Sequence, residues 1–449
     1  MLMKNRQPMD CQQCIWGEAN VETIPCAVEQ GEPCALKRLV ESADINQGEL
    51  TTARFNNYTL TSAFQPIYSL SHERVIAYEA LVRGKQGQET ISPWEIFSSA
   101  DGFEQTVELD RLCRTIHLHN YQRHIDQEAW LFLNINPQVV IGGRNYGSFF
   151  RELLDSTGIP PERIVVEILE HAIDDEQLLA ETVNYYREMG CLIALDDFGS
   201  GHSNFERIIR LRPDIVKLDT AMIRQAGDNV IARRIMPNLI AMLHEAGCLV
   251  LMEGVETQEE ALIALECNVD FVQGFYFAKP AAPQRLEAQQ CRQFSHLNRL
   301  YKEQFDQLTH QRERDLTHYR HHFAQAAAFY AAGIELEIAC QQLLGLPRVQ
   351  RCYVLNKMGS QLGDNLYPPN HNALQNIRFQ PLADTRGANW NRKPYFRNAI
   401  VHPGKVKVTR PYLSISGVEM CVTLSICIEL EEELQVICCD LSYHDGEQE

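Results

Sequence analysis

The sequence predicts an α/β protein built on a TIM-like (β/α)8 barrel, followed by a long connecting helix and a small α+β domain. Three observations support this prediction. Short apolar runs alternate with amphipathic segments over residues 55–290, many of these runs are followed by a polar residue, and strand-and-hairpin patterns appear only after a long helical stretch. Apolar strands that alternate with helices indicate a parallel sheet covered on both faces. So many repeats favour a closed barrel over an open sheet.

Length, charge and hydropathy narrow the class of protein. The chain has 449 residues, more than one ordinary domain holds. Its formal net charge of -18 argues against binding of duplex nucleic acid, which requires a basic face. Metal ions can nevertheless bridge an acidic site to a phosphate ligand. No stretch reaches the roughly 18 apolar residues that cross a bilayer, and the N-terminal residues lack the apolar core of a signal peptide. We therefore expect a cytoplasmic protein without membrane insertion.

Residues 1–50 form a cysteine-containing segment with little periodicity. Cys11, Cys14, Cys26 and Cys34 are spaced C-x2-C-x11-C-x7-C. A close thiol pair followed by two more thiols suits tetrahedral Zn²⁺, although the second pair is wider than in a standard zinc finger. We expect either one structural zinc ion, or unliganded thiols in a loose tail or a redox sensor. Most of the other cysteines lie singly in apolar segments, where a reduced, buried thiol is the usual state.

The barrel is expected over residues 51–285. Its strand-like runs share an apolar, β-branched composition and include Trp130–Asn134, Arg163–Glu167, Cys191–Leu195, Asp214–Lys217 and Cys248–Met252. Amphipathic helical segments lie between them, such as Asp175–Met189 and Asn229–Ala246. This alternation is typical of a barrel with an outer ring of helices.

Metal-capable or charged residues follow nearly every predicted strand. They are Glu79, Asn134, Glu167, Asp196 with Asp197, Lys217, Glu253 and Gln273. A lone acid after a strand is usually a helix cap or a solvated loop residue. In a parallel barrel, however, the C-terminal strand ends meet at one mouth, so these side chains are expected to converge. Carboxylates gathered there would repel one another unless cations held them, and an oxygen-rich set suits Mg²⁺ or Mn²⁺. Two such ions are a common device for phosphoester hydrolysis, and a lysine among them can position the attacking water.

The same residues lie in motifs that resemble those of the EAL-domain phosphodiesterases, which hydrolyse cyclic di-GMP to linear pGpG. The segment Glu79–Gly84 reads EALVRG and resembles the signature of that family. Further resemblances follow in order over roughly residues 55–285: Phe64–Ile67, Leu133–Pro137, Val166–Glu170, Leu195–Gly201, Val216–Asp219, Glu253–Glu256 and Val272–Phe275. The resemblance implies a variant (β/α)8 barrel with one antiparallel strand and two divalent ions, Mg²⁺ or Mn²⁺.

The resemblance also implies a role for each matching residue. The metal ligands it implies are Glu79, Asn134, Glu167 and Asp196 for one ion, Asp197 for the second, and Glu253 as a ligand or as the group that orients the attacking water. Lys217, Glu253 and Glu79 form the implied catalytic set, with Lys217 holding the water. The implied substrate contacts are Gln65, Leu81, Arg83, Asp197 and Gln273, with Arg83 on a phosphate. Glu170 would brace the loop after Asp197, while Asp219 and Glu256 would be supporting groups.

Residues 286–343 are expected to form one connecting helix. This segment contains no proline and a single glycine, Gly333. Its apolar residues recur at helical spacing: Phe294, Leu297, Leu300, Tyr301, Phe305 and Leu308. Such a seam indicates packing against a neighbour, and we expect a homodimer.

Residues 344–449 show strands and hairpins and weakly resemble small PAS- or Cache-type sensor modules. The resemblance rests on Trp390, Arg392, Pro394–Phe396, Pro411–Tyr412 and Asp440. It implies a pocket for an effector of unknown identity. The alternative is an ordinary aromatic core in a domain that serves only dimerisation.

The sequence therefore predicts a metal-dependent cyclic di-GMP phosphodiesterase acting in bacterial second-messenger signalling. A catalytically silent receptor that binds cyclic di-GMP and signals through a partner is the alternative, and a scaffold dominated by the two terminal regions is a third. Silent members of such families typically lose metal ligands or the lysine. The candidate metal ligands and Lys217 are all present in this sequence, which favours the enzyme.

Overall fold

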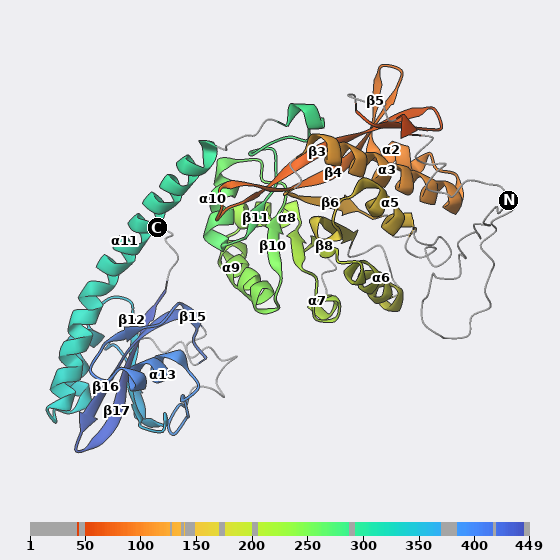
Figure 1. Ribbon diagram of the computed structural model, residues 1–449. Coiled ribbons are helices and arrows are strands. Elements are labelled where there is room, and N and C mark those ends of the chain that lie inside the picture. The colour runs from red at the N-terminus through yellow and green to blue at the C-terminus, as the bar shows by residue number, and fades with distance from the viewer. Residues whose placement is uncertain are drawn as a thin grey trace, which may run out of the picture. The chain divides into compact units, whose positions relative to one another are not determined.

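The computed structural model describes residues 43–44, 50–125, 128–135, 139, 149–169, 176–199, 205–286, 292–369, 384–415 and 419–443. The chain divides into two compact units, one up to Glu303 and one from Gln304 onward. Figure 1 shows the elements of each unit. Among the described residues, no helix combines the length and the apolar character needed to span a bilayer.

The first unit is a closed barrel of eight strands. They are β3 (Tyr58–Ser69), β4 (Arg74–Gln86), β6 (Trp130–Asn134), β7 (Ile164–Leu169), β8 (Leu192–Phe198), β9 (Ile215–Leu218), β10 (Leu249–Met252) and β11 (Phe271–Val272). Their order is β3-β11-β10-β9-β8-β7-β6-β4, and pairing of β3 with β4 closes the ring. Strand β3 runs antiparallel to both of its neighbours, whereas the other neighbouring pairs are parallel. The predicted barrel with one antiparallel strand is confirmed.

Short strands and helices surround this barrel. The additional strands are β1 (Ala43–Asp44), β2 (Thr52–Phe55) and β5 (Glu89–Ile91). The helices are α2 (Pro93–Ser98), α3 (Gly102–His124), α5 (Phe149–Thr157), η3 (Pro161–Arg163), α6 (Glu176–Glu188), α7 (Phe205–Leu211), α8 (Thr220–Asp228), α9 (Val230–Glu245), α10 (Gln258–Cys267) and η4 (Pro283–Arg285). Local sequence sets some of their starts: Thr257 and Glu260 form a capping box before α10, and the Asp219 side chain caps α8.

The interior of the barrel contains one apolar layer that draws a residue from each of its eight strands. The layer comprises Ile67, Ala77, Phe132, Val165, Ala194, Ile215, Leu251 and Phe271, all buried. Successive side chains of a strand point to opposite faces, so residues two positions further along point inward again. This layer therefore forms the floor beneath the next inward-facing layer.

Strand β4 differs from the prediction in one respect. Glu79 was expected to end its strand, but β4 continues through Arg83 to Gln86. The expectation is wrong because β3 is also long, and the antiparallel ladder between the two strands extends past Glu79 to the pair Thr59 and Lys85. Leu81 and Arg83 therefore lie on the same face of β4 as Glu79.

The connecting helix is also interrupted. Helix α11 runs from Arg292 to Ala331, and the boundary between the two compact units falls within it. Gly333 has φ +86°, and the Ile334 N–H donates to the Phe329 carbonyl while the Gly333 N–H donates to the Tyr330 carbonyl. These two bonds form a Schellman motif, which ends the helix. The prediction of one helix over 286–343 is therefore wrong, and a separate helix α12 (Leu336–Leu344) follows.

The second unit contains an antiparallel sheet with helices on both faces. Its strands are β12 (Val349–Asn356), β13 (Gln361–Leu366), β14 (Lys407–Val408), β15 (Tyr412–Leu413), β16 (Met420–Leu430) and β17 (Glu433–Ser442). The order is β13-β12-β17-β16-β14, with β15 also paired to β16. Phe323 and Cys340 from α11 and α12 pack on one face, while Tyr395 and Phe396 from α13 (Pro394–Val401) pack on the other. The arrangement is the α+β type expected from the sequence.

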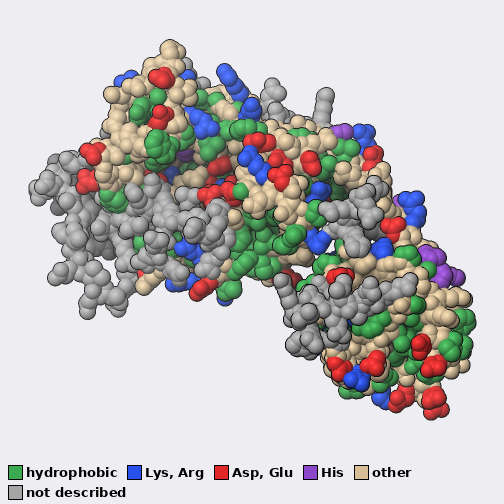
Figure 2. Space-filling view, turned by 180° about the vertical axis from the view of Figure 1, so that it is seen from behind, with side chains coloured by type: hydrophobic (Ala, Val, Ile, Leu, Met, Phe, Trp, Pro, Cys, Tyr) green, Lys and Arg blue, Asp and Glu red, His purple; other side chains and the backbone are tan. Residues whose placement is uncertain are grey.

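Charged side chains of both signs are mixed on the surface, and the cysteines of the described residues are buried. On the face shown in Figure 2, Lys and Arg side chains are scattered among Asp and Glu and form no continuous stripe among the described residues. The cysteines of the described residues are buried and free of disulfides. Burial raises the pKa of thiols such as Cys113, to about 12, so they remain protonated and unreactive.

Candidate active site

A polar layer lies directly above the apolar floor of the barrel. It contains one residue from or just beyond each strand: Gln65, Glu79, Asn134, Glu167, Asp196, Lys217, Glu253 and Gln273. Seven of these residues lie two positions after a floor residue of the same strand. Gln65 lies two positions before its floor residue because β3 runs in the opposite direction. Strand alternation thus turns all eight side chains toward the same interior space.

Lys217 lies at the centre of this layer and is almost fully buried. Its ammonium contacts Glu167, and it lies 2.6 Å from Glu253 Oε1 and 3.1 Å from Asp196 Oδ1. Burial alone would lower the pKa of Lys217, but Glu167, Glu253 and the other carboxylates together raise it well above its ordinary value. Lys217 is therefore a cation that balances part of the negative charge of the layer.

The carboxylates are held in an environment that disfavours their charge. Burial raises the pKa of Glu167 well above its ordinary value, despite the attraction of Lys217. Burial likewise raises the pKa of Glu253 to about 8, with Asp196 and Glu79 adding repulsion and Lys217 opposing it. One lysine is too little positive charge for this group of acids, so the layer favours additional cations.

Glu79 is oriented by two amides from opposite sides of the layer. Asn134 Nδ2 donates to Glu79 Oε1 at 3.1 Å, and Gln273 Nε2 donates to Glu79 Oε2 at 2.6 Å. The oxygens of both amides are left available to other ligands, and Gln273 Oε1 is buried without a hydrogen-bond partner. Glu79 and its neighbours therefore present oxygen atoms toward the mouth.

Asp196 and Asp197 adopt an unusual backbone at the end of β8. Asp197 has φ +58°, and the pairing of β8 with β9 shifts register between Leu195 and Phe198. The Asp197 N–H donates to Asp196 Oδ1 at 2.9 Å. A non-glycine residue in the left-handed region is strained, and such strain often lies at functional sites. Gly199 follows at φ +102°, where a Cβ would lie only 2.1 Å from Met222 Sδ, so glycine is required there.

The donor set fits divalent metal ions. Oxygen atoms of Glu79, Glu167 and Glu253 lie within 4.8 Å of one another, as do those of Asp196, Asp197 and Glu253. Glu167 Oε2 is buried and accepts no hydrogen bond, which leaves a lone pair directed into the site without a partner. Hard cations such as Mg²⁺ and Mn²⁺ prefer an all-oxygen set of this kind.

Of the residues expected to contact substrate, Leu81 and Arg83 lie beyond the polar layer on β4, whereas Gln65 and Gln273 belong to that layer. Gln65 Nε2 donates to the Ala278 carbonyl at 3.2 Å, and Arg83 Nη1 donates to the Val82 carbonyl at 2.8 Å. Burial lowers the pKa of Arg83, while Glu79 opposes this effect. Leu81 and Arg83 are both partly exposed, so a ligand at the mouth can reach them.

The supporting residues are placed less centrally. Asp219 accepts a hydrogen bond from the Ala221 N–H as a helix cap, and Glu256 forms an exposed ion pair with Arg224 at 3.6 Å. Glu170 lies outside the described residues, as do most of the loop after Asp197 and the cysteines Cys11, Cys14, Cys26 and Cys34.

One buried group behind Arg83 was not found by sequence reasoning. His117 of α3 has its Nδ1 2.8 Å from Ser62 Oγ, and Asn120 Nδ2 donates to the same oxygen at 3.1 Å. Burial, aided by the charge of Arg83, lowers the pKa of His117 to about 3, so it is neutral at physiological pH. The available signal was the i, i+3 spacing of His117 and Asn120 on the helix, and the other buried polar residues of α3, such as Asp110 and Arg114, obscure it.

The first unit is thus a closed mixed barrel with one reversed strand and a carboxylate-rich mouth that could hold metal ions. Comparison with known families is more specific. The family model described as EAL domain matches residues 47–280, just over half of the chain. The chain therefore belongs to the EAL-domain family.

Individual relatives extend this comparison. YkuI, an EAL-domain-containing protein of Bacillus subtilis, is 25% identical over 356 residues, which are 75% of this chain and 83% of YkuI. The cyclic di-GMP phosphodiesterase PdeF of Escherichia coli is 24% identical over 286 residues, or 61% of this chain, but this chain spans only 38% of PdeF. The crystal structure of YkuI in complex with cyclic di-GMP and calcium has a TM-score of 0.69 and 21% identity, covering 86% of this chain and 97% of that chain. The shared fold therefore extends into the second unit. The PAS or Cache relationship of that unit stays a prediction.

Proposed function

We propose that the barrel hydrolyses cyclic di-GMP to linear pGpG with divalent metal ions, Mg²⁺ or Mn²⁺, held at its mouth. The observation that carries this proposal is the convergence of Glu79, Asn134, Glu167, Asp196 and Glu253 around buried Lys217 in one interior layer. Membership of the EAL-domain family supports it. The name of PdeF and the ligand in the YkuI structure support cyclic di-GMP as the substrate.

The chain supplies oxygen ligands on two sides of the layer. Glu79, Asn134, Glu167 and Asp196 would hold one ion, and Asp197 would hold the second together with Asp196 and Glu253. Bound ions would lower the pKa of a coordinated water and stabilise the negative charge that develops on the phosphate.

The protein groups then position substrate and water. Lys217 stays protonated, so its ammonium can donate hydrogen bonds to the attacking water but cannot serve as a base. Glu253 lies 2.6 Å from that ammonium, so both groups can contact one water, and the carboxylate can accept its proton. Arg83 can hold a phosphate through its planar fork, while Gln65, Leu81 and Gln273 line the approach.

A direct assay tests the proposed function. Full-length protein incubated with cyclic di-GMP should yield pGpG in the presence of Mg²⁺ or Mn²⁺ and none after chelation, as separated by chromatography. Asn134→Ala should lower the rate strongly, because it removes an oxygen ligand together with the amide that orients Glu79. Undiminished hydrolysis by chelated, metal-free protein would contradict the metal-dependent mechanism. Binding of cyclic di-GMP without cleavage under all metal conditions would instead favour the silent receptor.

Substitution of Arg83 should separate binding from chemistry. Arg83→Ala is expected to raise KM about tenfold with a small change in kcat, since a phosphate grip formed before the reaction is lost. Arg83→Lys should recover only part of the affinity, because it restores the charge without the planar fork. Lys85→Ala, an exposed site two residues further along β4, serves as the matched control and should leave both constants unchanged. Equal losses of kcat and affinity in Arg83→Ala would refute this role.

Four expectations from the sequence stay predictions. A homodimer stays a prediction, but Phe294 and Leu297 of the apolar seam pack in the barrel core, and only Phe305 and Leu308 of the seam are exposed. A structural zinc ion at the four N-terminal cysteines also stays a prediction. The cytoplasmic location and the binding of an effector by the second unit also stay predictions.

A further inference from the structure

The second unit contains a pocket between its sheet and α13 that the barrel chemistry does not use. The pocket is small and open, and its volume of about 280 Å³ includes solvent outside its mouth. Arg351 and Tyr353 of β12 reach it from the sheet, because residues two apart on a strand share a face. Trp390, Lys393 and Tyr395 reach it from α13 and the segment before it. All of the lining residues belong to the second unit.

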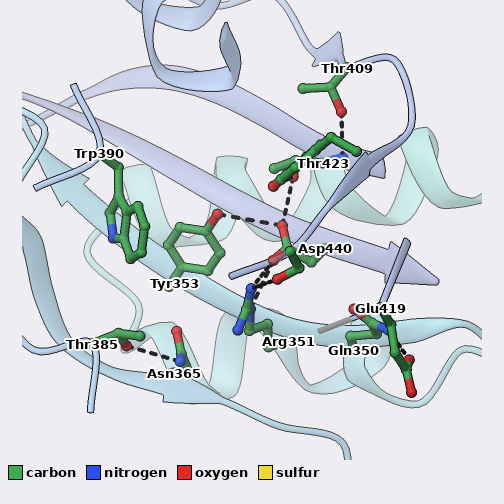
Figure 3. Close-up of polar contacts among 12 residues, drawn as sticks. Gln350, Arg351, Tyr353, Asn365, Thr385, Trp390, Thr409, Glu419, Thr423 and Asp440 are labelled. Carbon is green, nitrogen blue, oxygen red and sulfur yellow. Dashed lines mark hydrogen bonds and ion pairs between the residues drawn. The ribbon is translucent and has the colours of Figure 1, made fainter. Parts of the chain in front are cut away.

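Arg351 of the pocket lining forms a buried ion pair with Asp440 (Figure 3). Arg351 lies opposite Asp440 on the neighbouring strand β17, and its Nε and Nη2 donate to Asp440 Oδ2 at 2.8 and 2.6 Å. Thr423 Oγ1 donates to Asp440 Oδ1 at 2.7 Å, and Tyr353 Oη donates to the same atom at 3.4 Å. Asp440 is fully buried, and both of its oxygens are therefore occupied by protein donors.

The guanidinium of Arg351 is only partly used by these contacts. Its Nη2 also donates to Ser414 Oγ at 2.7 Å, but Nη1 donates to no group among the described residues. Arg351 is held rigidly by Asp440 and Ser414, and it lines the pocket. It therefore offers a fixed, unused N–H edge to a ligand, and its charge cannot be lost at physiological pH.

Lys393 provides a second cation on the wall. Its ammonium lies 5.9 Å from the centre of the Tyr412 ring, and it forms no ion pair with any described residue. The pocket lining contains no Asp or Glu, so Lys393 is not neutralised there. Since Asp440 balances Arg351, the pocket carries a net positive charge.

Aromatic rings complete the walls. Tyr395 and Tyr412 stack with centroids 6.1 Å apart, and Trp390 Nε1 donates to Gln361 Oε1 at 3.1 Å. Gln361 in turn donates to Thr385 and Asn365, which fixes the Trp390 side of the pocket. Rigid aromatic walls with a few oriented polar groups are typical of small-molecule sites.

We propose that this pocket binds the carboxylate group of a small organic acid, whose short body lies against the aromatic walls at the open mouth. The carboxylate would accept hydrogen bonds from Arg351 Nη1 and from the Lys393 ammonium, the two unused donors of the lining. A planar guanidinium edge matches the geometry of a carboxylate, and charge-assisted hydrogen bonds are the strong ones.

The same contacts disfavour an amino acid. Its ammonium would require an acceptor, and the one nearby carboxylate, Asp440, already accepts from Arg351, Thr423 and Tyr353. Gln361 Oε1 and Asn365 Oδ1 already accept hydrogen bonds from Trp390 and Gln361. The ammonium of an amino acid would thus be buried beside the positive charge of Lys393 without an acceptor to compensate it.

Calorimetric titration and thermal unfolding of the full-length chain test this proposal. The probes are acetate, propionate and benzoate, and each is compared with its neutral amide. Alanine is compared with propionate. Chloride at equal ionic strength controls for the effect of salt. At least one carboxylate should bind and raise the melting temperature, while its amide and alanine should bind at least about tenfold more weakly. Lys393→Gln should weaken that binding about tenfold, whereas Lys405→Gln, an exposed lysine of the same unit outside the pocket, should change it less than about twofold.

A second variant addresses the ion pair between Arg351 and Asp440. Arg351→Leu alone leaves Asp440 buried without its cation, so the double variant Arg351→Leu with Asp440→Leu is used to preserve folding. It should unfold cooperatively and bind none of the carboxylates. The proposal is overturned if no carboxylate binds at about 10 mM or if an amide or alanine binds as well as its carboxylate. It is also overturned if binding is unchanged in Lys393→Gln or survives in the folded double variant.

Discussion

Lys217→Ala should lower kcat for cyclic di-GMP hydrolysis by about two to three orders of magnitude while changing KM less than about threefold. Lys217 lies beneath the mouth and contacts Glu167, Asp196 and Glu253. A group in this position acts on the attacking water and on charge that develops in the transition state, not on the bound dinucleotide. Steady-state kinetics at saturating Mg²⁺ or Mn²⁺ provide the measurement.

Two controls make this result specific. Lys302→Ala removes an exposed lysine of α11 and should leave kcat unchanged. Metal content should be measured for Lys217→Ala, because loss of the ions would lower kcat for a different reason. If the variant retains its metals and its kcat, Lys217 has no part in the chemistry. If KM rises as much as kcat falls, Lys217 binds substrate instead.

Arg351→Leu should destabilise the second unit by about 3–5 kcal/mol, as measured by urea unfolding. The substitution leaves Asp440, which is fully buried, without the guanidinium that donates to its Oδ2. Adding Asp440→Leu should recover most of the lost free energy of unfolding, since a buried pair of apolar side chains replaces the ion pair. The comparison thus measures the cost of an uncompensated charge.

An exposed ion pair supplies the contrast. Arg233 and Glu266 lie 2.8 Å apart, but both side chains are about 40% exposed. Arg233→Leu should cost at most about 1 kcal/mol, because water screens the pair. A similar cost for Arg233→Leu and Arg351→Leu would show that burial does not decide the strength of these interactions. A double variant as unstable as Arg351→Leu alone would show that packing, and not the unpaired charge, dominates.

Much of the barrel site could be predicted from the sequence because the barrel repeats one local rule. Each strand is an apolar run with a polar residue near its end, and strand alternation places that residue two positions above a floor residue, as with Ile215 and Lys217. The closed ring then brings such residues together. The convergence could be predicted from the strand positions, which are local, whereas the residue roles and the one reversed strand were implied by the resemblance to the EAL-domain family.

The same reasoning failed where the outcome depended on a partner segment. Glu79 does not end its strand, because the length of β4 depends on the antiparallel pairing with β3. Gly333 was visible in the sequence, but periodicity could not show that its backbone adopts φ +86° and ends α11. A single glycine is compatible with a continuous helix, at a cost, and with a helix end.

The sequence by itself predicted the barrel and the residue types that face its mouth, since strand alternation is encoded locally. The reversed strand was implied only by the resemblance to the EAL-domain family. Only the tertiary structure decided the partners of Lys217 and the pocket of the second unit. Arg351 and Asp440 are separated by 89 positions, and the register of β12 on β17 makes them neighbours. Lys393 reaches the same pocket from the start of α13, through packing of that helix on the sheet. Contacts of this kind follow from long-range strand register and side-chain packing, which residue type and local periodicity do not predict.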